Sequence, residues 1–354
     1  MFTVSTWNVN SINMRKEQVL QLWRDLQIKN SNLVKEEEQK LIENGAKDSQ
    51  NDDANEVPNT HGVEIEIRPD MTIEDLDNIE NIEIDKHTGK PTDINKYDEG
   101  LGSKYGKMGV SQNTCLKISD LKRKSGVCIM LQELKCVDEK FPYAVFDDDI
   151  SNIVVHGQKR YNGIAILTDQ KVVCKKTTFK DNPCEDESRY LEVELANGIT
   201  LISVYVPNGT GVTHENYQKK LLFLKGLRNR LKQLHYENKH VVIGGDFNVA
   251  PFDIDVYSVA DMKNTLSFTM HEKVLIRQIL NLGYVDFYRI NSYNKKEFSW
   301  WDYRGGSVQN NHGLRIDYIL GNKADNFICC EMLKKMRCLD SPSDHIPVCA
   351  VIKV

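Results

Sequence analysis

The chain has 354 residues, and 40% of them are hydrophobic, which is enough for a sizeable core in one large domain or two small ones. Its formal net charge of −5 is unevenly distributed, because residues 30–106 contain 20 Asp/Glu and 8 Lys/Arg, and the remaining residues carry +7. The sequence has no run of about 18 apolar residues, so no transmembrane helix is expected. It also has no basic leader followed by an apolar region, so no signal peptide is expected.

Nine cysteines are scattered along the sequence without a CxxC pair. This pattern predicts free thiols in a reducing compartment, and therefore a cytoplasmic (bacterial nucleoid) or nuclear protein that is not secreted. The net charge of +7 on the 277 residues outside 30–106 suits a polyanionic partner, although a charge of this size is also typical of an ordinary protein surface.

The first elements in chain order are a strand over residues 2–9 and an amphipathic helix over 13–28. Asn8, near the end of the strand, offers an amide to a metal-bound water or a phosphate, or simply forms a turn. Residues 30–106 then interrupt the pattern with an acidic composition. We interpret them as an insertion within a single domain spanning 1–354, partly helical near 33–43 and otherwise disordered or loosely folded. Its partner is unknown; mimicry of DNA is an alternative to an inert insert.

The core resumes with a short helix over 116–122 and an apolar strand over 127–131. Glu133 follows that strand, and a carboxylate in this position is either salt-bridged or holds a cation. The next loop, residues 157–163, lies before another strand at 164–167. Its basic, aromatic and glycine residues suit contacts to a nucleic-acid backbone, or form a solvated hairpin.

Two strands, over 190–195 and 200–206, precede a basic amphipathic helix over 214–236. The strand after this helix ends in Gly244-Gly245-Asp246-Phe247-Asn248. The glycines allow a close approach of the backbone, and Asp246 and Asn248 share one face at period 2. A structural turn would not need both polar side chains on that face, which favours a catalytic role.

The last third of the chain contains a helix over 270–283, an aromatic segment over 298–306 and a strand over 313–320 that carries Asp317. The aromatic segment is either part of the core or a surface that packs on sugar and base. Asp344 and His345 precede the closing strand over 348–352, and a carboxylate beside an imidazole at a strand entrance suits phosphate chemistry.

Seven motifs occur in an order that resembles the exonuclease III family of apurinic/apyrimidinic (AP) endonucleases, within the endonuclease/exonuclease/phosphatase superfamily. They are Thr6-Trp7-Asn8-Val9-Asn10, Leu131-Gln132-Glu133, Tyr205-Val206-Pro207-Asn208-Gly209, Gly244-Gly245-Asp246-Phe247-Asn248, Trp301-Asp302-Tyr303-Arg304, Gly313-Leu314-Arg315-Ile316-Asp317 and Ser343-Asp344-His345. The match covers residues 1–28 and about 107–354. It implies a DNase I-like fold: a four-layer α/β sandwich of two mixed β-sheets face to face with helices outside.

The resemblance also implies a Mg²⁺ cofactor, with Mn²⁺ as an alternative, and a role for each site residue. The implied metal ligands are Glu133, with Asn8 nearby, and further Asp246, Asn248, Asp344 and His345. Asp246 would act as the general base or position the attacking water, and Asn248 would orient the phosphate. Asp344 would hold a second metal or support Asn8.

Three further catalytic roles follow from the same resemblance. His345 would contact the scissile phosphate or protonate a leaving oxygen, with its tautomer fixed by Asp317. Tyr205 would touch the phosphate or the leaving group. The residues implied to bind DNA are an apolar slot for a flipped sugar formed by Trp300, Leu314 and Ile316, Arg304 inserting near the lesion, and a backbone grip of Lys159, Arg160, Tyr161, Asn162 and Arg189.

The function implied is Mg²⁺-dependent hydrolysis of the DNA backbone 5′ to abasic sites in base excision repair, with 3′–5′ exonuclease and 3′-end-cleaning activity as variable additions. The partner would be double-stranded DNA with an abasic site. The protein would bind it as a monomer and would not associate with a membrane. The loop Asn208-Gly209-Thr210-Gly211 lacks the arginine that some relatives carry there, which puts a DNA wedge from this loop in doubt. The alternatives are another phosphoesterase of the superfamily, acting on a lipid or inositol phosphate, and a non-catalytic nucleic-acid-binding protein.

Overall fold

The computed structural model describes residues 1–48 and 125–354. The short helix expected over 116–122 and residues 49–106 of the predicted insertion lie outside this part. Contacts divide the chain into two units, Met1–Glu43 with Leu116–Val354 and Asn44–Cys115, and the first unit contains both large β-sheets. None of the helices in the described part combines the length and the apolar character that a membrane span requires.

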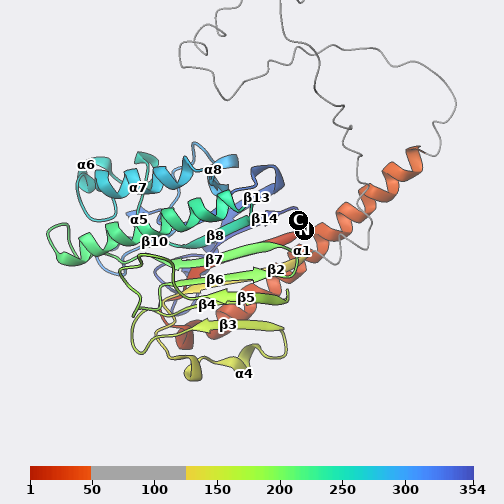
Figure 1. Cartoon of the computed structure of the whole chain (residues 1–354), viewed down its shortest axis with the longest axis horizontal. Coiled ribbons are helices and arrows are strands. Elements are labelled where there is room, and N and C mark those ends of the chain that lie inside the picture. Colours follow the sequence, from red (N-terminus) through yellow and green to blue (C-terminus); the bar gives the residue numbers. More distant parts are fainter. Residues whose placement is uncertain (49–124) are drawn as a thin grey trace, which may run out of the picture. The chain divides into compact units, whose positions relative to one another are not determined.

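The first sheet has six strands, with one parallel pair at its centre and antiparallel pairs outside it. In spatial order its strands are β13 (Phe327–Met332), β14 (Val348–Ile352), β1 (Phe2–Asn8), β2 (Gly126–Gln132), β4 (Ile164–Thr168) and β3 (Asn152–His156). The parallel pair is β1 with β2. Because β1 also pairs with β14, the two ends of the chain lie side by side (Figure 1).

The second sheet repeats this plan with β7 and β8 as its parallel pair. In spatial order its strands are β5 (Val172–Lys176), β6 (Tyr190–Leu195), β7 (Ile199–Tyr205), β8 (His240–Asp246), β12 (Asp317–Gly321) and β9 (Val285–Asp286). A small separate sheet consists of β10 (Trp300–Trp301) and β11 (Gly313–Leu314). Both large sheets are therefore mixed.

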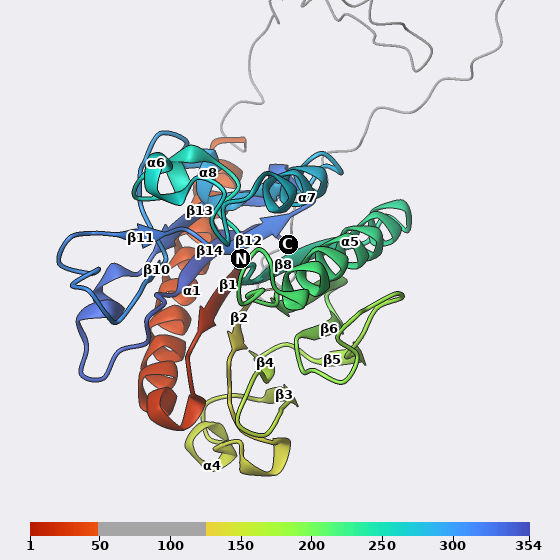
Figure 2. The same ribbon diagram turned by 90° about the vertical axis from the view of Figure 1, so that its left-hand side faces the viewer.

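Helices cover the outer faces of the two sheets (Figure 2). Within residues 1–48 and 125–354 the α-helices are α1 (Ile12–Asp48), α4 (Tyr143–Phe146), α5 (Glu215–Tyr236), α6 (Val259–Met262), α7 (Met270–Leu280) and α8 (Phe287–Asn291). Short 3₁₀ turns are η1 (Asp138–Lys140), η2 (Asp253–Asp255), η3 (Ala324–Asn326) and η4 (Lys334–Cys338). Helix α1 packs on the first sheet, and α5 and α7 pack on the second.

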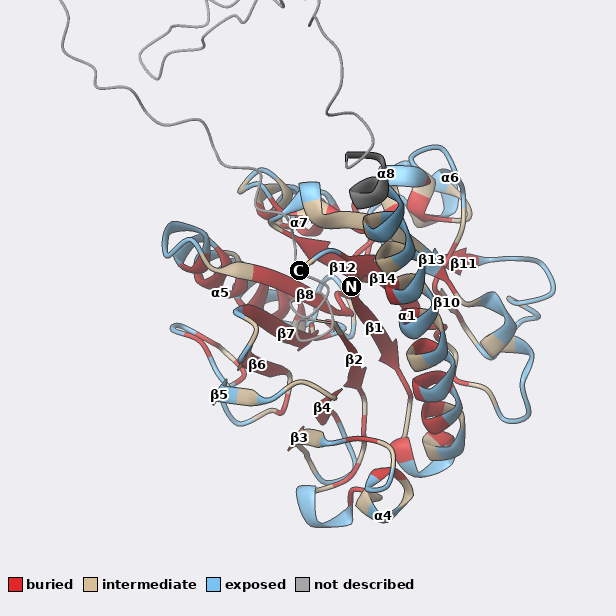
Figure 3. Ribbon diagram, turned by 90° about the vertical axis from the view of Figure 1, so that its right-hand side faces the viewer, coloured by how far each residue is buried: buried red, intermediate tan, exposed pale blue. Residues whose placement is uncertain are grey.

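The alternation of side chains along β2 shows how the layers are held together. Val127 and Ile129 pack with α1, whereas Cys128 and Met130 face the second sheet in the core between the sheets. All four are buried, and burial of one aliphatic side chain of this size contributes about 1.5–3 kcal/mol. Figure 3 shows the same division, with buried strands inside and exposed outer faces on α1 and α5. The predicted four-layer α/β sandwich is confirmed.

Two element boundaries differ from the sequence predictions. Helix α1 does not end at residue 28 but continues to Asp48, through the predicted start of the insertion. Its second half is rich in Glu, Lys and Gln, which favour helix without an apolar stripe, and Gln39 donates to Glu43 one turn later at 2.8 Å. That the remainder of 30–106 is an insertion within one domain stays a prediction.

The predicted strand over 313–320 is two strands, β11 and β12, separated by Arg315 and Ile316. The reason is the buried guanidinium of Arg315, which donates to Asp255 at 2.8 Å and Asp286 at 2.7 Å. The backbone N–H of Arg315 also donates to the carbonyl of Asp255 at 2.8 Å and leaves the sheet at this point.

Candidate active site

Polar side chains follow the central strands of both sheets where these strands meet at one edge. Asn8 ends β1, and Glu133 comes directly after β2, the parallel neighbour of β1. In the second sheet Tyr205 and Asp246 lie opposite each other at the ends of β7 and β8. Asp317, at the start of the antiparallel strand β12, is also opposite Asp246. Strand register alone therefore gathers side chains that are far apart in the sequence.

His345, just before β14, lies between two carboxylates. Its Nδ1 is 2.9 Å from Asp317 Oδ2 and 3.1 Å from Asp317 Oδ1, and its Nε2 is 3.7 Å from Asp246 Oδ2. Ser299 Oγ donates to Asp317 Oδ2 at 2.6 Å and so fixes the carboxylate. The structure brings together the predicted pair of Asp317 and His345, and directs the second ring nitrogen toward Asp246.

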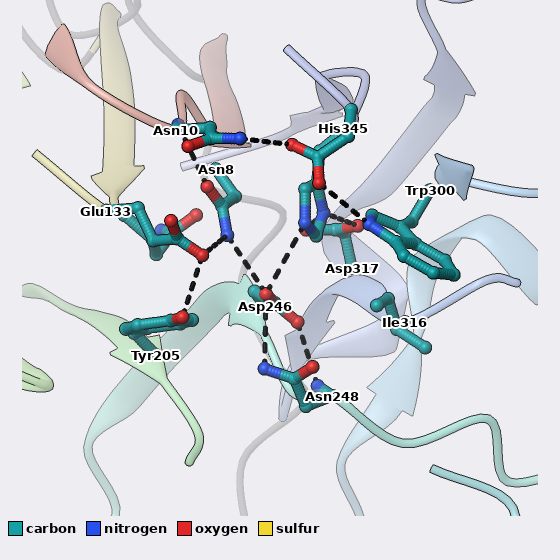
Figure 4. A network of polar contacts seen from close by, with 12 residues as sticks. Asn8, Asn10, Glu133, Tyr205, Asp246, Asn248, Trp300, Ile316, Asp317 and His345 are labelled. Atoms are coloured by element: carbon teal, nitrogen blue, oxygen red, sulfur yellow. Dashed lines mark hydrogen bonds and ion pairs between the residues drawn. The ribbon is translucent and has the colours of Figure 1, made fainter. Parts of the chain in front are cut away.

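Asn8 links Asp246 to a third carboxylate, that of Glu133 (Figure 4). Its Nδ2 donates to Glu133 Oε1 and to Asp246 Oδ2, both at 3.0 Å. Glu133 Oε1 also accepts from the hydroxyl of Tyr205 at 2.7 Å, and Glu133 Oε2 lies 2.9 Å from the ammonium of Lys135. Lys135 is a site residue that the sequence analysis missed, although it stands two positions after Glu133.

Asn248 is held beside Asp246 by the turn that follows β8. Its N–H donates to Asp246 Oδ1 at 2.8 Å, and its Nδ2 donates to the carbonyl of Val206 at 2.9 Å. The φ of Asn248 is +52°, a left-handed conformation that asparagine tolerates better than most residues. The predicted sharing of one site by Asp246 and Asn248 is therefore found, through this turn.

Asp344 points away from its neighbour His345. Its Oδ1 accepts from Asn10 Nδ2 at 2.9 Å, and its Oδ2 accepts from Trp300 Nε1 at 3.0 Å. The expected support of Asn8 by Asp344 is not found. Instead, Ser343 Oγ donates to the backbone carbonyl of Asn8 at 2.7 Å. Asp344 reaches Asn10 and Trp300 instead.

Burial and the charges of the site shift several pKa values. Burial raises the pKa of Asp246, and the charge of His345 opposes this rise. Burial lowers the pKa of His345, but the carboxylates of Asp317 and Asp246 outweigh it, so the net shift is upward and the imidazolium is favoured. Burial and the adjacent Glu133 carboxylate raise the pKa of Tyr205 well above its ordinary value, so the phenol keeps its proton.

A cavity of about 660 Å³ opens onto these side chains. We call its polar side the polar floor: Glu133, Tyr205, Asp246, Asn248 and His345 line it, and the buried side chains of Asn8 and Asp317 hold these residues from behind. Its other side, the apolar wall, consists of Tyr257, Met262, Leu266, Trp300, Leu314 and Ile316. Figure 4 shows Trp300 and Ile316 of the wall beside the floor.

The predicted slot residues Trp300, Leu314 and Ile316 all line this cavity. Trp300 on β10 pairs with Leu314 on β11, which places the two side chains in one small sheet. The sequence analysis missed Tyr257, Met262 and Leu266, which come from the segment after β8. No motif marks them, because their role follows from loop packing rather than from a strand end.

The residues predicted to grip the DNA backbone, and Arg304, which was predicted to insert near the lesion, differ in their exposure. Lys159, Arg160 and Tyr161 are exposed on the loop between β3 and β4, and Arg304 has a side chain that is 90% exposed. Asn162, in contrast, is buried and its amide donates to Gln158 at 2.9 Å.

Arg189, the last of these residues, is half-buried beside the floor. Its guanidinium pairs with Glu187 and lies 4.7 Å from the ring centroid of Tyr205. The loop between β3 and β4 thus exposes the cations Lys159 and Arg160, while the buried amide of Asn162 forms a hydrogen bond within the loop.

The oxygen atoms around Glu133 fit a hard divalent cation. The described residues also contain a cluster of Asp246, Asp317 and His345 whose ligand atoms lie within 4.8 Å of one another. Both oxygens of Asp317 are already engaged by His345, so this cluster is better described as a hydrogen-bonded pair with a neighbouring carboxylate. Glu133 differs, because its carboxylate already attracts the ammonium of Lys135, and carboxylate oxygens are the ligands that Mg²⁺ prefers.

Comparison with known proteins agrees with this arrangement. The model of the endonuclease/exonuclease/phosphatase family matches residues 68–345. The exodeoxyribonuclease III of Haemophilus influenzae is 30% identical over 239 residues, which are 64% of this chain and 89% of that protein. The chain therefore belongs to the endonuclease/exonuclease/phosphatase family, and within it to the relatives of exodeoxyribonuclease III.

Solved structures show the same fold. An AP endonuclease from Archaeoglobus fulgidus has a TM-score of 0.65 and 25% identity, with 100% of both chains covered. A 3′ phosphatase from Neisseria, solved with a product DNA hairpin, has a TM-score of 0.67 at 22% identity, also with 100% of both chains covered. The predicted family and fold are thus confirmed.

Proposed function

We propose that the chain is a metal-dependent DNA-repair nuclease that hydrolyses the DNA backbone 5′ to an abasic site and leaves a 3′-hydroxyl. Removal of 3′-terminal nucleotides and cleaning of blocked 3′ ends are proposed as further activities of the same site. The observation that carries the proposal is that one cavity combines the polar floor with an apolar wall. The similarity to exodeoxyribonuclease III and to an AP endonuclease supports the choice of DNA as substrate.

The polar floor offers a group for each part of phosphodiester hydrolysis. Asp246 accepts a proton from the attacking water, and its raised pKa makes it a stronger base than an ordinary carboxylate. The water oxygen forms the new bond to phosphorus as the bond to the 3′ oxygen breaks. The imidazolium of His345, oriented by Asp317, stabilises the negative charge that develops on the phosphate oxygens. Asn248 orients the same phosphate.

Tyr205 is the group proposed to assist the leaving 3′ oxygen. Its raised pKa keeps the phenol protonated at neutral pH, so it can donate a hydrogen bond or a proton to that oxygen. In the present structure the hydroxyl donates to Glu133 at 2.7 Å, on the side of the floor where a cation fits. A bound Mg²⁺, or Mn²⁺ as an alternative, supplies positive charge that neutralises the phosphate and the leaving oxygen. Glu133 would hold it, with Asp344 as a second candidate ligand.

Selection of an abasic site is proposed for the apolar wall. An extruded sugar without a base would enter between Trp300, Leu314 and Ile316, where a full nucleotide would be too large. Exposed Lys159, Arg160 and Arg304 would contact the flanking duplex. We propose a monomer in the cytoplasm or nucleus as the acting species.

Incision of a duplex with one abasic site tests this function, in Mg²⁺ and in EDTA, with the wild type, Asp246→Asn and Glu133→Ala. We expect the wild type to cut 5′ to the site only with the metal, and both variants to lose most of the activity. An abasic strand left whole by the wild type, together with hydrolysis of a phospholipid or inositol phosphate, would overturn the proposal in favour of another phosphoesterase. Tight DNA binding without any hydrolysis would favour a non-catalytic binding protein.

A further inference from the structure

A lysine without solvent exposure lies directly behind the catalytic cavity. The side chain of Lys220, on α5, is 0% exposed, as is that of its partner Glu272 on α7. Its ammonium donates to the carbonyl of Asn248 at 2.7 Å and to the carbonyl of Asn208 at 3.2 Å, and it also contacts the Glu272 carboxylate. One buried cation thus joins the loop after β7 to the loop after β8.

Glu272 extends the connection to the segment that carries part of the apolar wall. Its Oε1 accepts from Ser267 N at 3.1 Å, and its Oε2 accepts from Thr269 N at 2.9 Å and from Thr269 Oγ1 at 2.8 Å. These contacts form the capping box that begins α7. Leu266 of the apolar wall is the residue before Ser267, so the ion pair fixes the end of this wall segment.

The side-chain stem of Lys220 is packed between the same segments. A Cβ added at Gly209 would lie 3.0 Å from Leu266 Cδ1 and 3.4 Å from Lys220 Cδ, so both side chains lie close to the loop after β7. The backbone of Gly209, with φ of +100°, needs glycine at this position.

The contact of Lys220 with Asn248 bears on the catalytic turn itself. Asn248 has a left-handed backbone, and such conformations persist where surrounding contacts hold them. Its carbonyl is held by Lys220 on one side, while its N–H is held by Asp246 on the other. The pair of Lys220 and Glu272 reaches the cavity lining through backbone groups of Asn208, Asn248 and Ser267.

We propose that Lys220 and Glu272 are positioning residues that lock the Asn248 turn and the Leu266 segment into one unit, so that the polar floor and the apolar wall close on the substrate together. The proposal rests on the proposed nuclease function for its kinetic consequence. Its structural consequence, a shared stability of two loops, is independent of the reaction. The two consequences can therefore be tested separately.

The double variant Lys220→Met/Glu272→Gln removes both charges and retains one acceptor oxygen, which can serve the N–H of either Ser267 or Thr269. Replacing a buried ion pair by groups of similar volume is often neutral for stability, so we expect the melting temperature within ~5 °C of the wild type. The kcat for abasic-site incision should still fall about 10- to 100-fold, because the turn loses its shared donor. The KM should stay within about threefold, since DNA contacts are unchanged.

Lys219→Met is the matched control. Lys219 is the sequence neighbour of Lys220, but its side chain is 32% exposed and pairs with Glu187 rather than with Glu272.

Amide hydrogen exchange supplies the second readout. In the wild type we expect segments 246–250 and 262–269 to share one level of protection, and in the double variant we expect both to exchange faster at unchanged melting temperature. Different protection of the two segments in the wild type would overturn the proposal without any variant. If the double variant does not fold, the wild-type exchange pattern alone decides, because Glu272→Gln by itself would leave the buried ammonium of Lys220 without its counter-charge. Full kcat together with wild-type exchange in the folded double variant would show that the pair serves the fold only.

These results separate the two proposals. A wild type that cuts no DNA contradicts the nuclease function, while its exchange pattern still tests the coupling of the loops. A wild type that cuts abasic DNA but shows unrelated protection of 246–250 and 262–269 contradicts the coupling alone.

Discussion

The polar floor and the apolar wall of the cavity are built by different rules. The floor residues Asn8, Tyr205, Asp246 and Asp317 end or begin strands, and the register of the sheets places them together. The wall comes from the small β10–β11 sheet, from Ile316 after it and from the segment 257–266 after β8. We propose that the floor supplies the chemistry for any phosphate ester in the cavity, while the wall selects the substrate that enters.

The largest expected effect comes from the centre of the floor. Asp246→Asn keeps a group of the same size but cannot accept the proton from water, so kcat should fall by at least about 10³-fold. The loss should be the same for abasic-site incision and for 3′-end cleaning, because both need the base. Single-turnover rates on the two substrates measure it. Loss of only one activity would mean that the floor is not shared.

A second change in the floor alters the state of the imidazole. In Asp317→Asn, His345 loses the carboxylate that most raises its pKa, so that pKa should fall. Activity that depends on the imidazolium is present below the pKa of His345 and is lost as the pH rises through it. The alkaline limb of the kcat profile should therefore move to lower pH, with a loss of ~10²-fold at neutral pH. An unshifted limb would contradict the proposed role of His345.

A change in the wall should act on selection rather than chemistry. Leu266→Ala enlarges the cavity from a half-buried position, and the loss of a few methylene groups in an apolar pocket changes discrimination by about 10-fold or somewhat more. We expect abasic-site incision to lose this factor relative to 3′-phosphate removal. The ratio of kcat/KM for the two substrates measures it, with Lys219→Met as a surface control. An unchanged ratio would show that this part of the wall does not select.

The smallest effect is expected at the exposed loop. Lys159→Ala with Arg160→Ala should weaken DNA binding and reduce the slope of log K against log salt by about 1.8, since each phosphate contact contributes about 0.9. Asn162→Ala should leave the slope unchanged, because its amide holds the loop internally. Binding titrations at several salt concentrations separate the two. A reduced slope in Asn162→Ala would place that residue on the DNA.

The sequence was informative where a residue's role follows from its place on a strand. Asp246 and Asn248 after an apolar strand, and Glu133 after another, indicated a site that the structure assembles. Asp317 and His345 are 28 positions apart, and the family resemblance, rather than any spacing, led to their pairing. Trp300, Leu314 and Ile316 were reached through the same resemblance.

The sequence was uninformative where a role depends on packing between loops. The spacing of Lys220 to Tyr217, Phe223 and Leu224 places it on the apolar face of its helix, but the sequence does not show that Glu272 of another helix becomes its partner there. Asn162 lies in a basic loop, yet its amide turns inward. The helical structure predicted near 33–43 is found, but its continuity with the helix over 13–28 and its extension to Asp48 were not predicted, because the second half of α1 has no apolar stripe.

The division between floor and wall is tested most directly by one ratio. This is the rate of abasic-site incision divided by the rate of 3′-phosphate removal, measured under single-turnover conditions for the wild type, Asp317→Asn and Leu266→Ala. We predict that Asp317→Asn lowers both rates and leaves the ratio within about twofold, whereas Leu266→Ala lowers the ratio about 10-fold. A ratio that changes in Asp317→Asn and stays constant in Leu266→Ala would contradict the account.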